Sequence, residues 1–255
     1  MPPTLQLVRE NRPADAGAPP LITVVVCAYR HAAYIDECLA SVDATAPGVA
    51  IELIVIDDGS PDDTLARCLV RVSRTDLRLR IYTKPNQGLV HSLHCGLARW
   101  PKGRYFAVMA SDDSYGAGGS EQVQAALLAS ESPIGALLCQ AVYLAEHGNP
   151  IDGRPVYGQA HAVLLRGSAA ERLDAVCTEY PKPLLLQASV FETRPCAKSA
   201  SGATAWRSMT GRHSSASSWP RRQTRPRCAT AAISCWRATA CTATACTTGS
   251  TGNCG

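Results

Sequence analysis

The chain has 255 residues and a formal net charge of +4, which allows one large α/β domain or two small ones with a sizeable core. The charge is divided unevenly, because residues 1–194 hold 17 basic and 21 acidic residues, whereas residues 195–255 hold 8 basic residues and no acidic one. We therefore do not interpret the overall charge as a nucleic-acid signal and expect no specific nucleic-acid partner, although a basic end can bind polyanions non-specifically.

The cysteines and the hydropathy pattern indicate the compartment. Six of the 12 cysteines lie in residues 1–194, mostly inside apolar patterns, which is typical of reduced core thiols. The other six form no CxxC pair and have only His213 among them, which argues against a zinc site. No apolar run reaches the ~18 residues of a membrane span, and the N-terminus lacks an apolar secretion signal. We expect a soluble, cytoplasmic protein.

Residues 1–194 predict a leader followed by alternating strands and helices. Residues 1–20, with five prolines, predict a flexible leader. Apolar runs predict strands at 22–27, 51–56, 79–83, 104–109 and 184–191, with a further run at 134–142. Helical spacing predicts helices at 34–42, 62–72, 88–99 and 121–130. This alternation favours an α/β fold with a mainly parallel central sheet flanked by helices, occupying residues 21–194.

Residues 195–255 differ in composition from the rest of the chain. They contain no Leu, Val or Phe and a single Ile, so they cannot bury enough apolar area to offset the entropy of ordering. We expect a disordered tail without a core. Its mixture of Ala, Thr, Ser, Arg, Cys and Trp resembles an out-of-frame translation of a G/C-rich gene.

The frameshift hypothesis can be checked against the codons. Reading from the third base of the Met209 codon into Thr210 gives GAC, an Asp codon, because Met has one codon and all Thr codons begin with AC. With G or C at the third positions, Gly202 to Thr210 becomes R-D-G-L-A-L-D-D. The shifted text restores the Leu and acidic residues that the tail lacks.

Adjacent carboxylates follow two of the predicted strands. Asp57-Asp58 comes after 51–56, and Asp112-Asp113 comes after 104–109. Each pair also fits a polar turn that closes a buried strand. Because the carboxyl ends of parallel strands meet at one edge, where ligands collect, two such pairs favour a binding site. A nucleoside diphosphate suits it, since a divalent cation must neutralise the phosphates while a separate acceptor holds the base.

Four motifs in order resemble those of glycosyltransferase family 2. They are Ala28-Tyr29-Arg30, Asp57-Asp58-Gly59-Ser60, Asn86-Gln87-Gly88 and Ala110-Ser111-Asp112-Asp113. The resemblance covers residues 21–194 and implies the nucleotide-diphospho-sugar transferase (GT-A-like) fold, incomplete at its C-terminal side. Arg30 stands where the family usually has Asn, and Ala110 stands where the metal motif usually begins with an acid.

The resemblance also implies roles for residues of the donor site. The nucleotide-binding candidates are Ala28, Tyr29, Asp57, Asp58, Asn86, Gly88 and Asp112. Of these, Ala28 and Tyr29 would line the base pocket and Asp57 would hold the base. Asp113 would bind Mg²⁺ or Mn²⁺, with Asp112 as its helper or as a ribose contact, and the reverse order of these two stays open.

The implied partners are a nucleotide-diphosphate sugar donor and a saccharide, lipid-linked or other hydroxyl acceptor, as in polysaccharide or cell-envelope biosynthesis. Gln187 is a candidate contact for the acceptor or the diphosphate. Such a protein would be cytoplasmic or peripheral at the inner face of the membrane, with no transmembrane segment.

The family reaction is a single displacement with inversion, in which an Asp of an E-D or D-D pair removes the acceptor proton. That pair follows the strand represented here by 184–191, at a point where this chain has Ser208, Met209 and Thr210. None of the three is a carboxylate, so the general base is expected to be absent from the chain as written. Surface or packing roles are expected for four histidines of residues 1–194, namely His91, His94, His147 and His161.

Two other functions remain open. A sugar-phosphate nucleotidyltransferase shares the sheet and the metal, but its first strand should lead into a Gly-rich basic loop, which Arg30-His31-Ala32-Ala33 is not. A non-catalytic nucleotide-binding remnant would result if the missing base and acceptor region leave the chain inactive.

Overall fold

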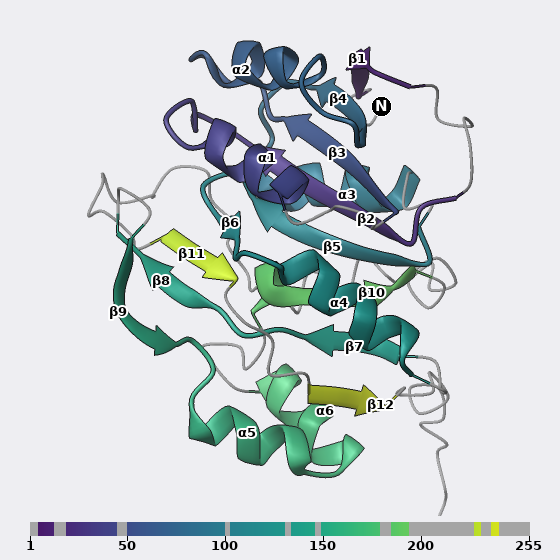
Figure 1. Cartoon of the computed structure of the whole chain (residues 1–255), viewed down its shortest axis with the longest axis vertical. Coiled ribbons are helices and arrows are strands. Elements are labelled where there is room, and N and C mark those ends of the chain that lie inside the picture. Colours follow the sequence, from purple (N-terminus) through teal and green to yellow (C-terminus); the bar gives the residue numbers. More distant parts are fainter. Residues whose placement is uncertain are drawn as a thin grey trace, which may run out of the picture.

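The computed structural model describes residues 5–12, 19–44, 50–99, 103–130, 134–145, 149–178 and 185–193, and the backbone of 227–230 and 236–239. An eight-stranded sheet lies at the centre (Figure 1). Its strands, in spatial order, are β1 (Gln6–Glu10), β4 (Arg78–Thr83), β3 (Ile51–Asp57), β2 (Ile22–Ala28), β5 (Tyr105–Ala110), β10 (Ser189–Glu192), β7 (Ile134–Leu138) and β12 (Trp236–Thr239). A smaller sheet contains β6 (Ser114–Tyr115), β11 (Arg227–Thr230), β8 (Val142–Leu144) and β9 (Pro150–Pro155).

The middle of the large sheet is parallel, which confirms the predicted architecture. β2 pairs in parallel with β3 and with β5, and β3 pairs in parallel with β4. Every residue of β2 and β3 is buried, because helices cover both faces and continuous apolar runs fill both sides of each strand. β1, β10 and β12 are antiparallel to their neighbours.

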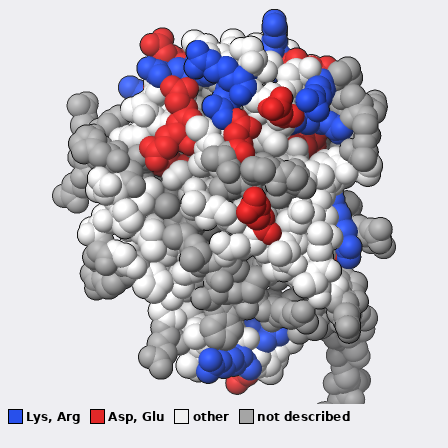
Figure 2. All heavy atoms as spheres, in the orientation of Figure 1, with Lys and Arg blue, Asp and Glu red and all other residues white. Residues whose placement is uncertain are grey.

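Helices divide between the two faces of the sheet. The helices are α1 (Ile35–Ala44), α2 (Thr64–Arg71), α3 (Leu89–Arg99), α4 (Gly119–Leu128), α5 (Gln159–Arg166) and α6 (Ala169–Thr178), with the 3-10 turn η1 (Leu186–Ala188). Apolar residues of α1, α2 and α4 belong to one core cluster, and those of α3 belong to the other. Ion pairs Arg67–Asp36 and Arg71–Asp43 join α1 to α2, and charged side chains of both signs gather at that end of the molecule (Figure 2).

The N-terminal residues differ from the leader predicted for 1–20. Gln6–Glu10 form β1 on the edge of β4, and Leu5 is buried. Asn11 fixes the end of this strand, because its side chain donates to Leu77 O at 2.7 Å and accepts from Leu79 N at 2.9 Å. Residues 6–10 form a strand because they pair with β4, which is distant in the sequence. The proline content of residues 1–20 gave no sign of this pairing.

The region after β5 contains more and shorter secondary-structure elements than the sequence predicted. The apolar run 134–142 splits into β7 and β8, and the strand predicted at 184–191 begins as η1 and continues as the antiparallel β10. Helices α5 and α6, which the sequence patterns did not predict, lie at the opposite end of the molecule from β1 (Figure 1).

Two short strands, β11 and β12, come from residues 195–255. β12 extends the edge of the large sheet beside β7, whereas β11 lies between β6 and β8 in the smaller sheet. The other residues of 195–255 lie outside the described part, so the predicted coreless tail stays a prediction. Among the helices of the described residues, none is both long enough and apolar enough to span a membrane.

A buried polar network ties the amino-terminal ends of the central strands together. Glu52 and Arg80 form an ion pair whose side chains are 0% and 3% exposed. Thr23 Oγ1 donates to Glu52 Oε2 at 3.3 Å and accepts from Gly103 N at 3.0 Å. Gly103 is packed so closely that a Cβ would lie 2.8 Å from both Thr23 N and Tyr105 O. Only a glycine fits here, because backbone atoms block the side chain.

We predict that Gly103→Ala lowers the free energy of unfolding by ~1–3 kcal/mol, because the backbone must shift to admit the methyl group. Urea unfolding followed by circular dichroism measures it. Gly119→Ala is the matched control, since a Cβ there meets nothing within 4 Å, and it should be neutral or gain up to ~1 kcal/mol. Equal effects of both changes would contradict the packing argument.

Candidate functional site

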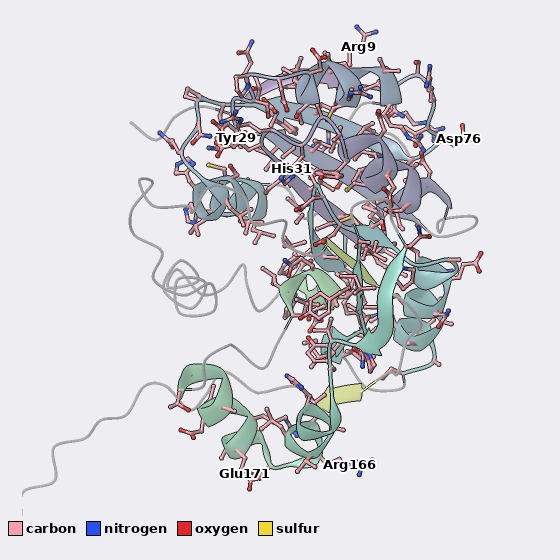
Figure 3. The ribbon with its side chains drawn as sticks, turned by 90° about the vertical axis from the view of Figure 1, so that its left-hand side faces the viewer. Arg9, Tyr29, His31, Asp76, Arg166 and Glu171 are labelled. Atoms are coloured by element: carbon pink, nitrogen blue, oxygen red, sulfur yellow. The ribbon has the colours of Figure 1, made fainter. Side chains whose placement is uncertain are left out.

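The predicted site residues come together at one edge of the large sheet. The turns after β2, β3, β4 and β5 all lie at the carboxyl ends of parallel strands. The chain runs from β2 outward through β3 to β4 and then returns to β5 on the other side of β2. The direction of winding therefore reverses between β2 and β5, which is where open α/β sheets bind ligands. Tyr29 and His31 lie at this edge (Figure 3).

Asp57, the last residue of β3, has one carboxylate oxygen without a partner. Oδ2 accepts from Ser60 N at 3.1 Å and from Thr83 Oγ1 at 3.2 Å. Oδ1 is buried and has no hydrogen-bond partner among the described residues. A buried acceptor without a donor is costly, so an N–H group of a ligand would be favoured there.

Asp58 is already fully engaged by the protein. Its Oδ1 accepts from Gln87 N at 3.0 Å and pairs with Lys84, and its Oδ2 accepts from Gly88 N at 2.8 Å. The Lys84 side chain is 0% exposed. Asp58 thus holds the turn after β4 against the end of β3. The sequence reasoning missed this role and missed Lys84, although a lysine directly after a buried strand is a visible signal. The nucleotide contact predicted for Asp58 stays a prediction.

Two glycines permit this close approach of the turns. Gly59 has φ +67°, and a Cβ there would lie 3.0 Å from Lys84 O and 3.1 Å from Asn86 N. Gly88 has φ +85°, which favours glycine, and the space beside it is open. Asn86 is exposed between them. The D-D-G-S and N-x-G motifs therefore form one structural unit.

Asp112 and Asp113 follow β5 and differ in exposure. Asp113 N donates to Ala110 O at 3.1 Å, which closes a turn. Asp113 is buried at 7% exposure, whereas the Asp112 side chain is 37% exposed. No group of three or more His, Cys, Asp or Glu side chains placed to hold a metal occurs among the described residues. Such a pair fits a cation that takes its remaining ligands from phosphates and water, as Mg²⁺ does in nucleotide sites.

His31 is a site residue that the sequence reasoning did not single out. Its Nδ1 lies 2.7 Å from Ser111 Oγ and 3.8 Å from Asp112 Oδ1. It comes two residues after Tyr29, on the turn after β2, and this position beside a predicted ligand turn was the available signal.

The remaining predicted residues lie at the same edge. Ala28 is buried, and Tyr29 is 39% exposed. Gln187 is half-buried in η1, which contacts the end of β5. These positions are compatible with the predicted base pocket and acceptor contact, which stay predictions.

Burial shifts the pKa of one cysteine and of one histidine among the described residues. Burial, reinforced by Asp58, raises the pKa of the Cys27 thiol to about 12, so this thiol is neutral at physiological pH. Burial lowers the pKa of His91, whose ring contacts Cys95 on α3. The His161 ring packs against Tyr157, with centroids 5.0 Å apart. His147 lies outside the described residues.

Comparison with known proteins shows which family the chain is similar to. Residues 23–136, less than half of the chain, match the family model described as glycosyl transferase family 2. An uncharacterized glycosyltransferase of Haemophilus influenzae is 43% identical over 95 residues, 37% of this chain and 28% of that protein. The hyaluronan synthase of Pasteurella multocida is 32% identical over 121 residues, 43% of this chain and 12% of that protein. The chain therefore matches less than a third of the length of these relatives.

A solved structure confirms the fold of the chain. Residues 1–349 of S. aureus TarS, in complex with UDP-GlcNAc, superpose with a TM-score of 0.50 and 22% identity. The match covers 69% of this chain and 46% of that one. The central sheet and its helices are thus those of the nucleotide-diphospho-sugar transferase fold.

Arg30 has φ +57°, the left-handed region, and is the non-glycine residue with positive φ among the described residues. We predict that Arg30→Asn raises the free energy of unfolding by ~1 kcal/mol, because Asn tolerates this region better than other L-residues. Thermal and urea unfolding measure the change. Arg30→Ala keeps the Cβ and should give no gain, so an equal gain from both variants would contradict the backbone argument.

Proposed function

We propose that the protein is a metal-assisted, inverting glycosyltransferase that moves a sugar from a nucleotide-diphosphate donor to an acceptor hydroxyl. The observation that carries this proposal is the convergence of the unpartnered Asp57 Oδ1 and the Asp112–Asp113 turn on one sheet edge. One group suits the base of a donor, and the other suits the cation that accompanies its diphosphate. The similarity of residues 23–136 to glycosyltransferase family 2 supports the same reaction class.

The nucleoside would bind over the turns after β2 and β3. Asp57 Oδ1 would accept an N–H of the base, which relieves its unpaired state. Ala28 and the exposed ring of Tyr29 would flank the base, and a base can stack on an aromatic ring. Asp58, the other predicted nucleotide contact of this motif, would also support the site by holding Gln87 and Gly88 through their backbone amides.

The diphosphate would lie toward the end of β5. Asp113 and Asp112 would hold Mg²⁺ or Mn²⁺, which when bound neutralises the charge of the departing nucleoside diphosphate. Their carboxylates would help to orient the leaving group so that the acceptor hydroxyl could attack from the opposite side, the geometry of inversion. Gln187, in η1, which contacts β5, would contact the acceptor or the diphosphate.

The chain as written has no carboxylate at the point where the base is expected. Ser208, Met209 and Thr210 stand there, and we propose that a frameshift between Glu192 and Lys198 replaced the original sequence. Two features of the sequence support the frameshift. Residues 195–255 have an unusual composition, and the shifted frame contains the D-D pair that the chain lacks at this point. This favours, as a second candidate, a non-catalytic chain that still binds nucleotide. Positioned acid–base groups contribute ~10²–10⁴-fold to rate, so their loss would leave little turnover.

The acceptor class that we favour is a saccharide or lipid-linked saccharide of polysaccharide or cell-envelope biosynthesis. The similarity to a hyaluronan synthase supports it. We place such a protein in the cytoplasm, where it could act at the inner face of the membrane. A nucleotidyltransferase is less well supported, because the turn after β2 presents Arg30 and His31 in place of a Gly-rich loop.

We predict that the full chain binds UDP or GDP more tightly with Mn²⁺ than in EDTA, measured by isothermal titration calorimetry. Asp113→Asn should weaken metal-dependent binding ~10-fold or more, because a charge-assisted contact is lost. Asp174→Asn, on the exposed surface of α6, is the matched control and should bind as the original chain does. Absence of binding to any nucleoside diphosphate would refute the donor site.

We predict that a gene with its frame restored between the codons for Glu192 and Lys198 encodes a protein that transfers sugar ~10²–10⁴-fold faster than the chain as written. Release of nucleoside diphosphate from a panel of UDP- and GDP-sugars, in the presence of saccharide acceptors, measures it. Equal rates for the two proteins would show that the written chain has its own base and needs no frame correction.

A further inference from the structure

His31 is held rigidly at the start of α1. Its N–H donates to Thr64 Oγ1 at 2.9 Å, and its carbonyl accepts from Tyr34 N at 3.0 Å and from Ile35 N at 2.9 Å. Its ring meets the Tyr34 ring edge-on, with centroids 6.1 Å apart and an interplanar angle of 77°. Backbone and ring are both constrained, so the imidazole presents Nδ1 in a defined direction.

His31 Nδ1 forms its hydrogen bond with the buried hydroxyl of Ser111. Ser111 is 0% exposed, and its Oγ lies 2.7 Å from His31 Nδ1. No other partner of this hydroxyl occurs among the described residues. Asp112 Oδ1, at 3.8 Å from the same nitrogen, is too far for a hydrogen bond. His31 therefore bonds the serine and leaves the neighbouring carboxylate outside that bond.

This contact continues the connection between β2 and β5 beyond their backbone ladder. The ladder ends at the pair Cys27 and Ala110. Ser111 opens the turn that carries the two acidic residues, and His31 lies on the turn after β2. The hydrogen bond thus joins the turn after β2, where the base of the donor would bind, to the turn after β5, where the metal would bind.

We propose that His31 is a positioning residue, which holds the turn 110–113 so that Asp112 and Asp113 meet the metal–diphosphate part of the donor. This inference rests on the proposed donor site. It adds one residue to that site and assigns this residue to the diphosphate end. His31 acts through Ser111 on the diphosphate end and not on the base. Loss of the bond leaves a buried hydroxyl unpaired and frees the turn, so metal-dependent binding weakens while metal-independent binding does not.

The test compares nucleoside diphosphate affinity with Mn²⁺ and in EDTA, by isothermal titration calorimetry on full-length variants, using UDP or GDP, whichever binds the original chain more tightly. His31→Ala should reduce the gain in affinity that Mn²⁺ brings by about tenfold, with the affinity in EDTA changed less than about twofold. Ser111→Ala should give the same loss, and the double variant should add nothing to it. His94→Ala, an exposed histidine of α3, is the control and should change neither value.

Two conservative variants keep the test decisive if the alanine variants fold poorly. In His31→Asn the amide occupies the place of Nδ1, so metal-dependent binding should be retained within about threefold. In His31→Gln the amide reaches the place of Nε2 instead, and the loss should match that of alanine. Equal affinities for Asn and Gln, or equal losses with Mn²⁺ and in EDTA, overturn the positioning role. Failure of the original chain to bind either nucleotide overturns the donor site itself.

Discussion

The parallel pairing of β2 with β3 on one side and with β5 on the other is the constraint on which this structure depends. It buries β2 on both faces and along both edges, and it places the ends of three strands at one edge of the sheet. The chain winds outward on one side and then returns to the other, so the two acidic turns lie at the edge where open α/β sheets bind ligands. The candidate site follows from this topology before any particular side chain is considered.

Polar groups at that edge divide into those satisfied by the protein and those left for a ligand. Asp58 accepts hydrogen bonds from Lys84 and from two backbone amides, so it holds the turn after β4 against the end of β3. Asp57, its neighbour in sequence, keeps one buried oxygen for which the described residues provide no partner. Two adjacent carboxylates thus serve different purposes, because successive residues at a strand end point in different directions.

Buried polar side chains connect different parts of the structure at the two ends of the central strands. At the amino-terminal end, Arg80 and Thr23 both bond Glu52, which links three strands, and close backbone atoms require a glycine at 103. At the carboxyl end, the corresponding links run between turns, through Asp58 and through the His31–Ser111 bond. A rigid base under a set of side-chain-linked turns is an arrangement suited to holding a charged ligand in one orientation.

By itself, the sequence determined the parallel strands, most helices and the acidic turns, because β-branched runs, helical spacing and Asp-Gly signals are local. It did not reveal β1, α5 and α6, or that the strand at 184–191 starts as a 3-10 turn and then runs antiparallel, since these depend on partners far along the chain. Only the tertiary structure separated Asp57 from Asp58 and brought His31 to Ser111, 80 residues away. Hydrogen bonds between turns are set by how strands stack, and no local pattern encodes that.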